Sequence, residues 1–339
     1  MNVFELTRAL IDIESITNNE ERVGAFLLEY LTPLASQYGG RLEAIEVEPR
    51  RFNIFAQWGE RLTVTLSTHI DTVPPFFISR EDDEHIWGRG ACDTKGIIAS
   101  MIKAVEAMLE AGERDFGLLF VVGEERTSAG AYKAAKTPRG SKYIINGEPT
   151  ENRLALGSKG SLRYEVVASG KMAHSAYPEL GDSAIHKLID ALAEMRRIPL
   201  PVDPLLGPST LNIGTLAGGR APNVIADEAH ADIMIRLVGD SAEIKKALTR
   251  AAHGLADLRE VIEIPALRMN SLDGIDTTVV AFTTDIPAFG GQWGEPFLIG
   301  PGTIHVAHTL EERVPKVQLI EAVQIYQRMV KLLCKRESK

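Results

Sequence analysis

The sequence has little cysteine, no block of basic residues and no long apolar run, and each absence excludes a class of protein. Only Cys92 and Cys334 occur in 339 residues, which suits a reducing compartment and provides no disulfide framework. The net charge is −9, and no cluster of lysine or arginine could follow a phosphate backbone, so we expect no nucleic-acid partner. Without eighteen consecutive apolar residues or a secretory signal pattern, the chain is expected to be cytoplasmic and to lack membrane contact.

What is present is an ordinary globular composition, 45% hydrophobic and 24% charged, with enough length for two domains. Apolar residues at helical spacing predict two helices within 3–35 and a third over 94–111, with Asp93 or Thr94 as its N-cap. Short apolar runs predict strands at 42–47, 52–58, 61–68, 116–123 and 142–146. Alternating strands and helices indicate an α/β domain.

A second pattern begins after residue 158. It predicts strands at 161–168, 210–216, 223–237 and near 261, and helices at 182–195 and 241–255. The order βαββαβ is that of a ferredoxin-like domain inserted into a larger one. A closing helix is predicted over 316–333. We therefore expect residues 1–158 and 269–339 to form one domain and residues 159–268 to form an inserted domain.

Polar side chains gather at the predicted strand ends and in the loops beside them. They are His69, Asp71, Asp93, Glu124, Glu125, Glu148 and one late histidine, either His305 or His308. Two imidazoles and three carboxylates can hold two divalent ions if one carboxylate bridges them, which leaves each ion an open position. Histidine with carboxylates and no thiolate suits Zn²⁺, with Co²⁺ or Mn²⁺ as substitutes. The neighbouring glutamates point apart in an extended segment and can take different roles.

Several short motifs occur in a fixed order along the chain. They are Thr68-His69-Ile70-Asp71, the stretch from Gly88 to Gly96, Gly123-Glu124-Glu125, Gly147-Glu148-Pro149, and Ala307-His308 followed by Glu311. In this order they resemble the dizinc aminoacylase/carboxypeptidase family that includes acetylornithine deacetylase, succinyl-diaminopimelate desuccinylase and glutamate carboxypeptidase. The resemblance implies a mixed-sheet zinc-hydrolase catalytic domain with helices on both faces, and an inserted ferredoxin-like domain that serves as lid and dimerisation domain.

The resemblance also implies roles for the strand-end residues. His69 and Glu148 would hold one zinc ion, Glu125 and His308 would hold the other, and Asp93 would bridge them. Asp71 would orient His69. Glu124 would act as the general base and then as the general acid. The Ala-His spacing favours His308 over His305 as the late ligand.

In the inserted domain the stretch from Gly170 to Gly181 resembles a family motif, and its histidine, His174, would stabilise the oxyanion in the partner subunit of a homodimer. Asn223 and Arg236 resemble residues that bind the substrate carboxylate, although Arg220 is close enough in sequence to compete for this role. Gly300 and Gly302 resemble a substrate-lining turn.

The expected activity is therefore metal-dependent hydrolysis of the amide bond in a small N-acyl amino acid with a free carboxylate, an N-deacylase of amino-acid metabolism. A dizinc dipeptidase or carboxypeptidase acting on small peptides is the alternative. The resemblance implies that glutamate at position 148 favours substrates of deacylases or carboxypeptidases over peptides with a free N-terminus. A catalytically silent binding protein on the same fold is a third reading. The acyl group and the amino acid are not specified by the sequence.

Overall fold

The structure, a computed structural model, describes residues 1–337. The chain forms two compact units. The first unit contains Met1–Leu156, Met269–Thr278 and the chain from Thr284 onward, and the second contains Gly157–Arg268 and Val279–Thr283. Over residues 1–337, no helix combines the length and apolar character needed to cross a membrane.

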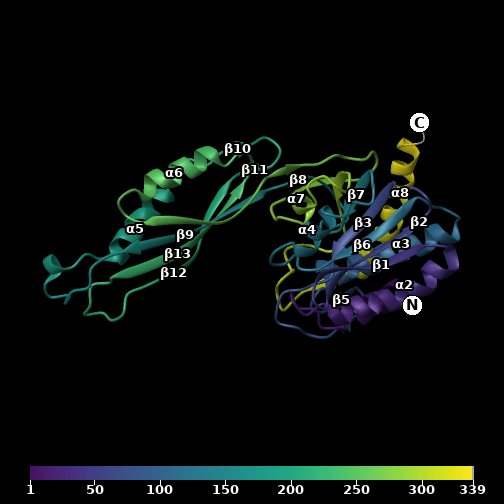
Figure 1. Cartoon of the computed structure of the whole chain (residues 1–339), viewed down its shortest axis with the longest axis horizontal. Coiled ribbons are helices and arrows are strands. Elements are labelled where there is room, and N and C mark those ends of the chain that lie inside the picture. The colour runs from purple at the N-terminus through teal and green to yellow at the C-terminus, as the bar shows by residue number, and fades with distance from the viewer. Residues whose placement is uncertain (338–339) are drawn as a thin grey trace. The chain divides into compact units, whose positions relative to one another are not determined.

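A six-stranded mixed sheet forms the centre of the first unit (Figure 1). In spatial order its strands are β1 (Arg41–Glu48), β2 (Arg51–Trp58), β6 (Phe116–Val121), β3 (Val64–His69), β7 (Tyr143–Asn146) and β17 (Glu295–Leu298). The pairs β1–β2 and β2–β6 are antiparallel. The strands β6, β3, β7 and β17 run parallel to one another. The carboxyl ends of these four strands therefore lie along one edge of the sheet.

Helices cover both faces of this sheet, as predicted. One face packs against α1 (Val3–Ile11), α2 (Glu21–Tyr38), α3 (Gly96–Glu110) and α8 (Lys316–Arg336), and the other against α4 (Ala129–Ala135) and α7 (Ile286–Phe289). Strand β6 is apolar on both sides, which explains why both faces are covered. Leu118 lies in the core under α1, α2, α3 and α8, while its neighbour Leu119 lies in the core under α4 and α7. A strand buried on both faces requires a continuous apolar run.

The second unit has the predicted βαββαβ order. Its strands are β9 (Gly160–Ser169), β12 (Thr210–Gly218), β13 (Glu228–Leu237) and β14 (Asp257–Ile264), and its helices are α5 (Ala184–Met195) and α6 (Ala242–Ala252). The sheet order is β12–β13–β9–β14 with every pair antiparallel. Alternate residues of β13 face the two helices, and they are all apolar: Ala229, Ala231, Ile233, Ile235 and Leu237.

Shorter elements complete the chain. They are β4 (Arg80–Glu81), β5 (His85–Trp87), the π-helical turn η1 (Ala91–Lys95), β8 (Leu154–Ser158), the 3₁₀ turn η2 (Pro178–Leu180), β10 (Val202–Asp203), β11 (Gly207–Pro208), β15 (Leu267–Arg268), β16 (Thr277–Val280) and β18 (Arg313–Pro315). Strands β18, β5 and β4 form a small antiparallel sheet.

Two local predictions are wrong. Neither Asp93 nor Thr94 caps α3, because Lys95 directly precedes the helix and no side chain caps it. The carboxylate of Asp93 is turned instead toward two histidines. The strand predicted over 223–237 begins only at Glu228, because Asn223 lies in a loop, where its carbonyl accepts a hydrogen bond from Ser175 N.

Candidate metal centre

Three parallel strands bring the polar residues together at one edge of the sheet. Strand β3 ends at His69, the segment Gly123–Glu125 follows β6 closely, and Glu148 lies two residues after β7. In parallel sheets this edge is where ligands bind, because the carboxyl ends of adjacent strands meet there. Asp93 joins them from the turn η1 before α3, and His308 from the loop before β18.

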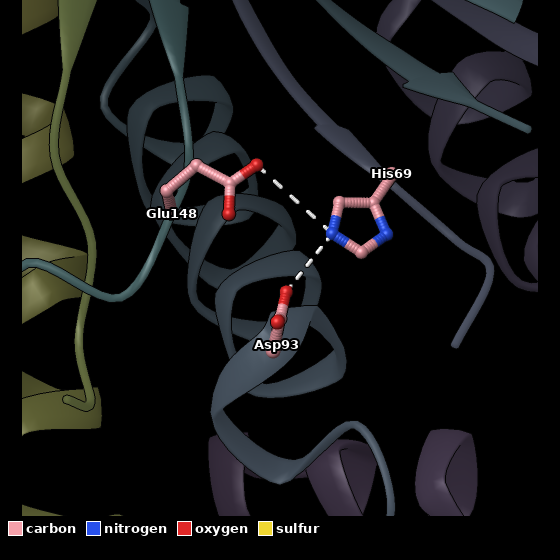
Figure 2. Close-up of side chains that lie close together, drawn as sticks. All are labelled: His69, Asp93 and Glu148. Carbon is pink, nitrogen blue, oxygen red and sulfur yellow. Dashed lines mark hydrogen bonds and ion pairs between the residues drawn. The ribbon is translucent and has the colours of Figure 1, made fainter. Parts of the chain in front are cut away.

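The first group of candidate ligands consists of His69, Asp93 and Glu148, all buried. Figure 2 shows that one ring nitrogen of His69 faces both carboxylates. His69 Nε2 lies 3.0 Å from Asp93 Oδ1 and 4.0 Å from Glu148 Oε1. The three side chains therefore enclose a single position.

The second group consists of Asp93, Glu125 and His308. His308 Nε2 lies 3.1 Å from Asp93 Oδ2 and 3.0 Å from Glu125 Oε2. Asp93 thus presents one oxygen to each histidine, which is the arrangement of a bridging carboxylate. His308 has a positive φ of 62° and a half-exposed side chain. His305 is also exposed, but it belongs to neither group.

The donor set fits divalent cations. In each group the donor atoms lie within 4.8 Å of one another. Bonds of about 2.0–2.1 Å to a tetrahedral zinc ion would place two donor atoms roughly 3.3 Å apart. This spacing lies between the 3.0 Å and 4.0 Å that separate His69 Nε2 from the carboxylate oxygens of Asp93 and Glu148. Glu148 Oε1 is also buried without a hydrogen-bond partner among the described residues. A buried unsatisfied carboxylate oxygen is costly, and a cation at the enclosed position would satisfy it.

The electrostatics of the cluster lead to the same conclusion. Burial first, and then the neighbouring carboxylates, raises the pKa of Glu125 and raises that of Glu148 well above its usual range. Hydrogen bonds to Asp93 and Glu125 raise the pKa of His308 to about 10. Acidic groups at close range disfavour one another's charged forms, and a divalent ion removes this repulsion.

Asp71 lies behind His69, and both its backbone carbonyl oxygen and its carboxylate approach the imidazole. His69 Nδ1 is 2.9 Å from the backbone carbonyl oxygen of Asp71 and 3.5 Å from its carboxylate oxygen Oδ1. The carbonyl is therefore the closer partner, and a donor Nδ1–H leaves Nε2 free for a metal ion. The carboxylate of Asp71 also accepts backbone N–H groups from the loop Gly123–Glu125.

Glu124 lies beside the two groups of candidate ligands and is partly buried. Its backbone N–H donates to Asp71 Oδ1 at 3.1 Å, while its side chain has no hydrogen bond or ion pair with another described residue. Burial raises the pKa of Glu124 well above its usual range. A carboxylate without a fixed partner beside a metal cluster is suited to accept and return a proton.

One supporting residue, Glu312, was missed from the sequence. Glu311, which we matched to the family motif, is exposed, whereas Glu312 is buried and pairs with Arg89 at 2.6 Å between Oε2 and Nη1. Glu312 Oε1 accepts the backbone N–H of Asp93 at 3.3 Å. The sequence offers little signal for this, because Glu312 directly follows Glu311 and only the structure shows which of the two is buried.

Gly300 and Gly302 lie beside the ligands in the first unit, and both are buried. A Cβ at Gly300 would come within 2.6 Å of Glu148 O, and one at Gly302, where φ is 88°, within 2.4 Å of Cys92 Cβ. Glycine is thus required for close packing against the ligand loops. Contact with substrate at this turn stays a prediction.

The remaining candidate residues lie in the second unit. The isolated bridge His174–Val224 and the hydrogen bond from Ser175 N to Asn223 O join the two loops that carry His174 and Asn223. His174 is exposed, and its Nδ1 accepts the backbone N–H of Ala176 at 3.1 Å.

Arg236 and Arg220 differ sharply in their surroundings. The guanidinium of Arg220 is exposed and binds both carboxylate oxygens of Asp227 at 3.0 Å. Arg236 on β13 is partly buried, has no hydrogen bond or ion pair with another described residue, and has a pKa lowered by burial. A partly buried arginine without a counter-ion is electrostatically unsatisfied, so Arg236 is the better candidate to bind an anion.

The comparisons with known proteins agree with this geometry. The model of the peptidase family M20/M25/M40 matches residues 65–332. A peptidase M20 domain-containing protein of Schizosaccharomyces pombe is 38% identical over 343 residues, covering 97% of this chain and 84% of the relative. A probable carboxypeptidase of Aspergillus niger is 35% identical, covering 97% of this chain and 89% of the relative.

A solved structure from Bacillus subtilis, described as a dinuclear metal-binding peptidase of the M20 family, shares the fold. The TM-score is 0.70 with 16% identity, and the match covers 96% of this chain and 95% of that one. The match of the family model over most of the chain, together with relatives above 30% identity, settles the assignment. The chain belongs to the peptidase family M20/M25/M40.

Proposed function

We propose that the protein is a two-metal carboxypeptidase that removes the C-terminal residue from small peptides. The observation that carries the proposal is the bridging placement of Asp93, with one carboxylate oxygen toward His69 and the other toward His308. His69, Asp93 and Glu148 would hold one Zn²⁺, and Asp93, Glu125 and His308 the other. Names of relatives such as the probable carboxypeptidase of Aspergillus niger support the peptidase reading over our first expectation of an N-deacylase.

Two such ions, when bound, supply an acidified water and polarise the scissile carbonyl. Glu124 would accept the proton of the attacking water and donate it to the leaving nitrogen, because its carboxylate has no hydrogen bond or ion pair with another described residue. The backbone carbonyl of Asp71 would hold His69 in the tautomer that leaves Nε2 available.

The substrate carboxylate would bind to Arg236, with Asn223 as a further donor. Arg236 has no counter-ion within the described residues, whereas Arg220 already has one in Asp227. A planar guanidinium binds a carboxylate through two parallel hydrogen bonds. A carboxypeptidase needs such a group because every substrate of this class ends in a free carboxylate.

His174 would stabilise the oxyanion in the active site of a second copy of the chain, so the working enzyme would be a homodimer joined through the second unit. The exposed apolar residues of that unit support this proposal, since large exposed side chains mark interaction surfaces. They include Met172, Tyr177, Leu180, Ile189 and Leu216, each at least half exposed. Closure of the second unit as a lid would supply the remaining contacts.

Hydrolysis of N-acyl amino acids is the second candidate. The same ligand set and the same carboxylate-binding arginine serve both reactions, because the leaving amine carries a free carboxylate in each. By the resemblance given above, glutamate at position 148 favours these two substrate classes over peptides recognised by a free N-terminus.

A substrate panel tests the proposal. Dipeptides and tripeptides with a free C-terminus, the same peptides amidated at the C-terminus, and acetyl, succinyl and glutaryl amino acids would be assayed with Zn²⁺ or Co²⁺. We expect turnover of free-carboxylate peptides and loss of turnover on amidation. Preference for acyl amino acids would establish the second candidate, and equal turnover of amidated peptides would reject both.

A further inference from the structure

The carboxylate of Asp71 is a fully buried hub that gathers backbone groups of the loop Gly123–Glu125. Its Oδ1 accepts the N–H of Gly123 at 2.9 Å and that of Glu124 at 3.1 Å, and its Oδ2 accepts the N–H of Glu125 at 3.3 Å. This loop carries the proposed general base and one proposed metal ligand. The position of the Asp71 carboxylate therefore sets the position of both glutamates.

A fourth donor to this carboxylate comes from the N-terminal segment 15–20. The hydroxyl of Thr17 donates to Asp71 Oδ2 at 2.8 Å, the shortest of the four bonds, and Thr17 is only 7% exposed. Backbone hydrogen bonds hold the donor in place: Thr17 N donates to Thr72 O at 3.1 Å, and Thr72 N donates to Ser15 O at 2.9 Å. The segment is therefore fastened to the residue that follows Asp71.

The same segment also supports the loop from the side of Gly123. Glu20 is buried and binds Arg51 through both carboxylate oxygens, at 2.6 and 2.8 Å. A Cβ at Gly123 would approach Arg51 Nη2 to 2.9 Å, and Gly123 has a φ of 81°. The guanidinium fixed by Glu20 thus lies directly against the first residue of the loop.

We propose that Thr17 is a positioning residue for Glu124 and Glu125, acting through the carboxylate of Asp71. It lies outside the family match, which begins at residue 65. Oδ2 has two donors, the Thr17 hydroxyl and Glu125 N, so loss of the shorter bond leaves the carboxylate free to tilt and to carry the loop with it. Catalysis tolerates little of this, because a misplacement of about 1 Å can cost roughly a hundredfold in rate.

The proposal rests on the proposed function for the role of Glu124, but not for the contact itself. Thr17→Val keeps the shape of the side chain and removes the donor, and Thr17→Ser keeps the donor. Thr7→Val is the matched control, because Thr7 is also a buried threonine, and its hydroxyl donates only to Val3 O at 2.8 Å within α1.

Two measurements are made on the full chain with saturating Zn²⁺: amide hydrogen exchange of Gly123–Glu125, and kcat and KM on the best peptide of the panel. For Thr17→Val we expect exchange about tenfold faster at the loop and kcat about tenfold lower, with KM changed less than about twofold. Thr17→Ser should restore both values, and Thr7→Val should leave both unchanged. A Tm for each variant confirms that the chain is folded.

Unchanged loop exchange in folded Thr17→Val would overturn the positioning role, whatever the activity. Equal loss of kcat in Thr7→Val and Thr17→Val would also overturn it, since a general loss of packing would then explain the effect. If the unsubstituted protein hydrolyses nothing in the panel, the proposed function fails, while faster loop exchange in Thr17→Val alone would still support the positioning of the loop.

Discussion

Arg89 and Glu312 form a fully buried ion pair, 2.6 Å between Nη1 and Oε2, directly behind the loop that carries Asp93. The second oxygen of Glu312 accepts the backbone N–H of Asp93. Glu312 lies four residues after His308, so one carboxylate connects the segments of two candidate ligands. Burial raises the pKa of Glu312 to about 7, while Arg89 favours its charged form.

Replacing Glu312 by glutamine should weaken metal binding about ten- to hundredfold, the usual effect of removing support behind a ligand. The buried guanidinium of Arg89 would also lose its counter-ion, which costs about 3–5 kcal/mol of folding stability. Metal titration and thermal unfolding measure the two effects. The neighbouring exposed residue provides the control, and Glu311→Gln should change neither quantity.

Replacing Glu124 by glutamine should keep both metal ions and lower kcat by about 10²–10⁴-fold, the range typical of a general acid–base group. The reason is that the amide cannot carry the proton from water to the leaving nitrogen. Elemental analysis and steady-state kinetics together test this. A variant with full activity would remove Glu124 from the reaction.

His308→Ala should lose about one metal ion per chain, because it removes the only imidazole of the second group of candidate ligands. His305→Ala should lose none, since that side chain belongs to neither group. Zinc content after dialysis, measured per chain, separates the two. An unchanged count in His308→Ala would contradict the ligand assignment.

Arg236→Lys should raise KM for free-carboxylate substrates about tenfold, because lysine keeps the charge and loses the fork that binds both carboxylate oxygens. The matched change Arg220→Lys should leave KM as it is, since Arg220 is already paired with Asp227. Kinetics on one peptide and its C-terminal amide give the comparison. A larger effect at Arg220 would reverse the assignment.

Metal binding should release protons. In the metal-free protein the pKa of His308 is about 10, so at neutral pH the imidazole is protonated and must lose its proton to become a ligand. The apparent affinity for Zn²⁺ should therefore rise as the pH is raised from about 6 toward about 10. Titration calorimetry in two buffers of different ionisation enthalpy measures the protons released, and equal heats in both would contradict the prediction.

Removing the metal should lower Tm without unfolding the sheet. An ion present at about a hundred times its Kd stabilises the native state by about 2.7 kcal/mol, and a chelator removes that contribution. The core on both faces of the sheet is apolar and does not depend on the ions. Far-UV circular dichroism with and without chelator should therefore be unchanged below the melting range.

The sequence predicted the buried strands well, because a buried strand requires a continuous apolar run. The apolar runs before His69, Glu124 and Glu148 predicted three strands, and the structure has β3, β6 and β7 at these places, with the polar residues at one edge. The candidate ligands named from the sequence lie together in two groups, His69, Asp93 and Glu148 in one and Asp93, Glu125 and His308 in the other. The parts that sequence could not supply are contacts between segments far apart, such as the hydroxyl of Thr17 on Asp71.

The errors in predicted helix ends also come from contacts between distant segments. Aspartate is a preferred N-cap residue, yet the contacts of Asp93 with His69 and His308 override that local preference. Neither the dimer, the lid nor the cytoplasmic location follows from the contacts within one chain, and these three stay predictions.

The bridging residue Asp93 joins a histidine from the first quarter of the chain to one near its end, at His69 and His308. The first group of candidate ligands lies entirely before the inserted segment, with Glu148 as its last member, whereas the second takes His308 from beyond that segment. The core of the first unit is likewise closed by residues from the end of the chain, among them Phe297 and Tyr326. The complete cluster therefore requires residues from both sides of the insertion, and a chain that ends before His308 lacks the second histidine.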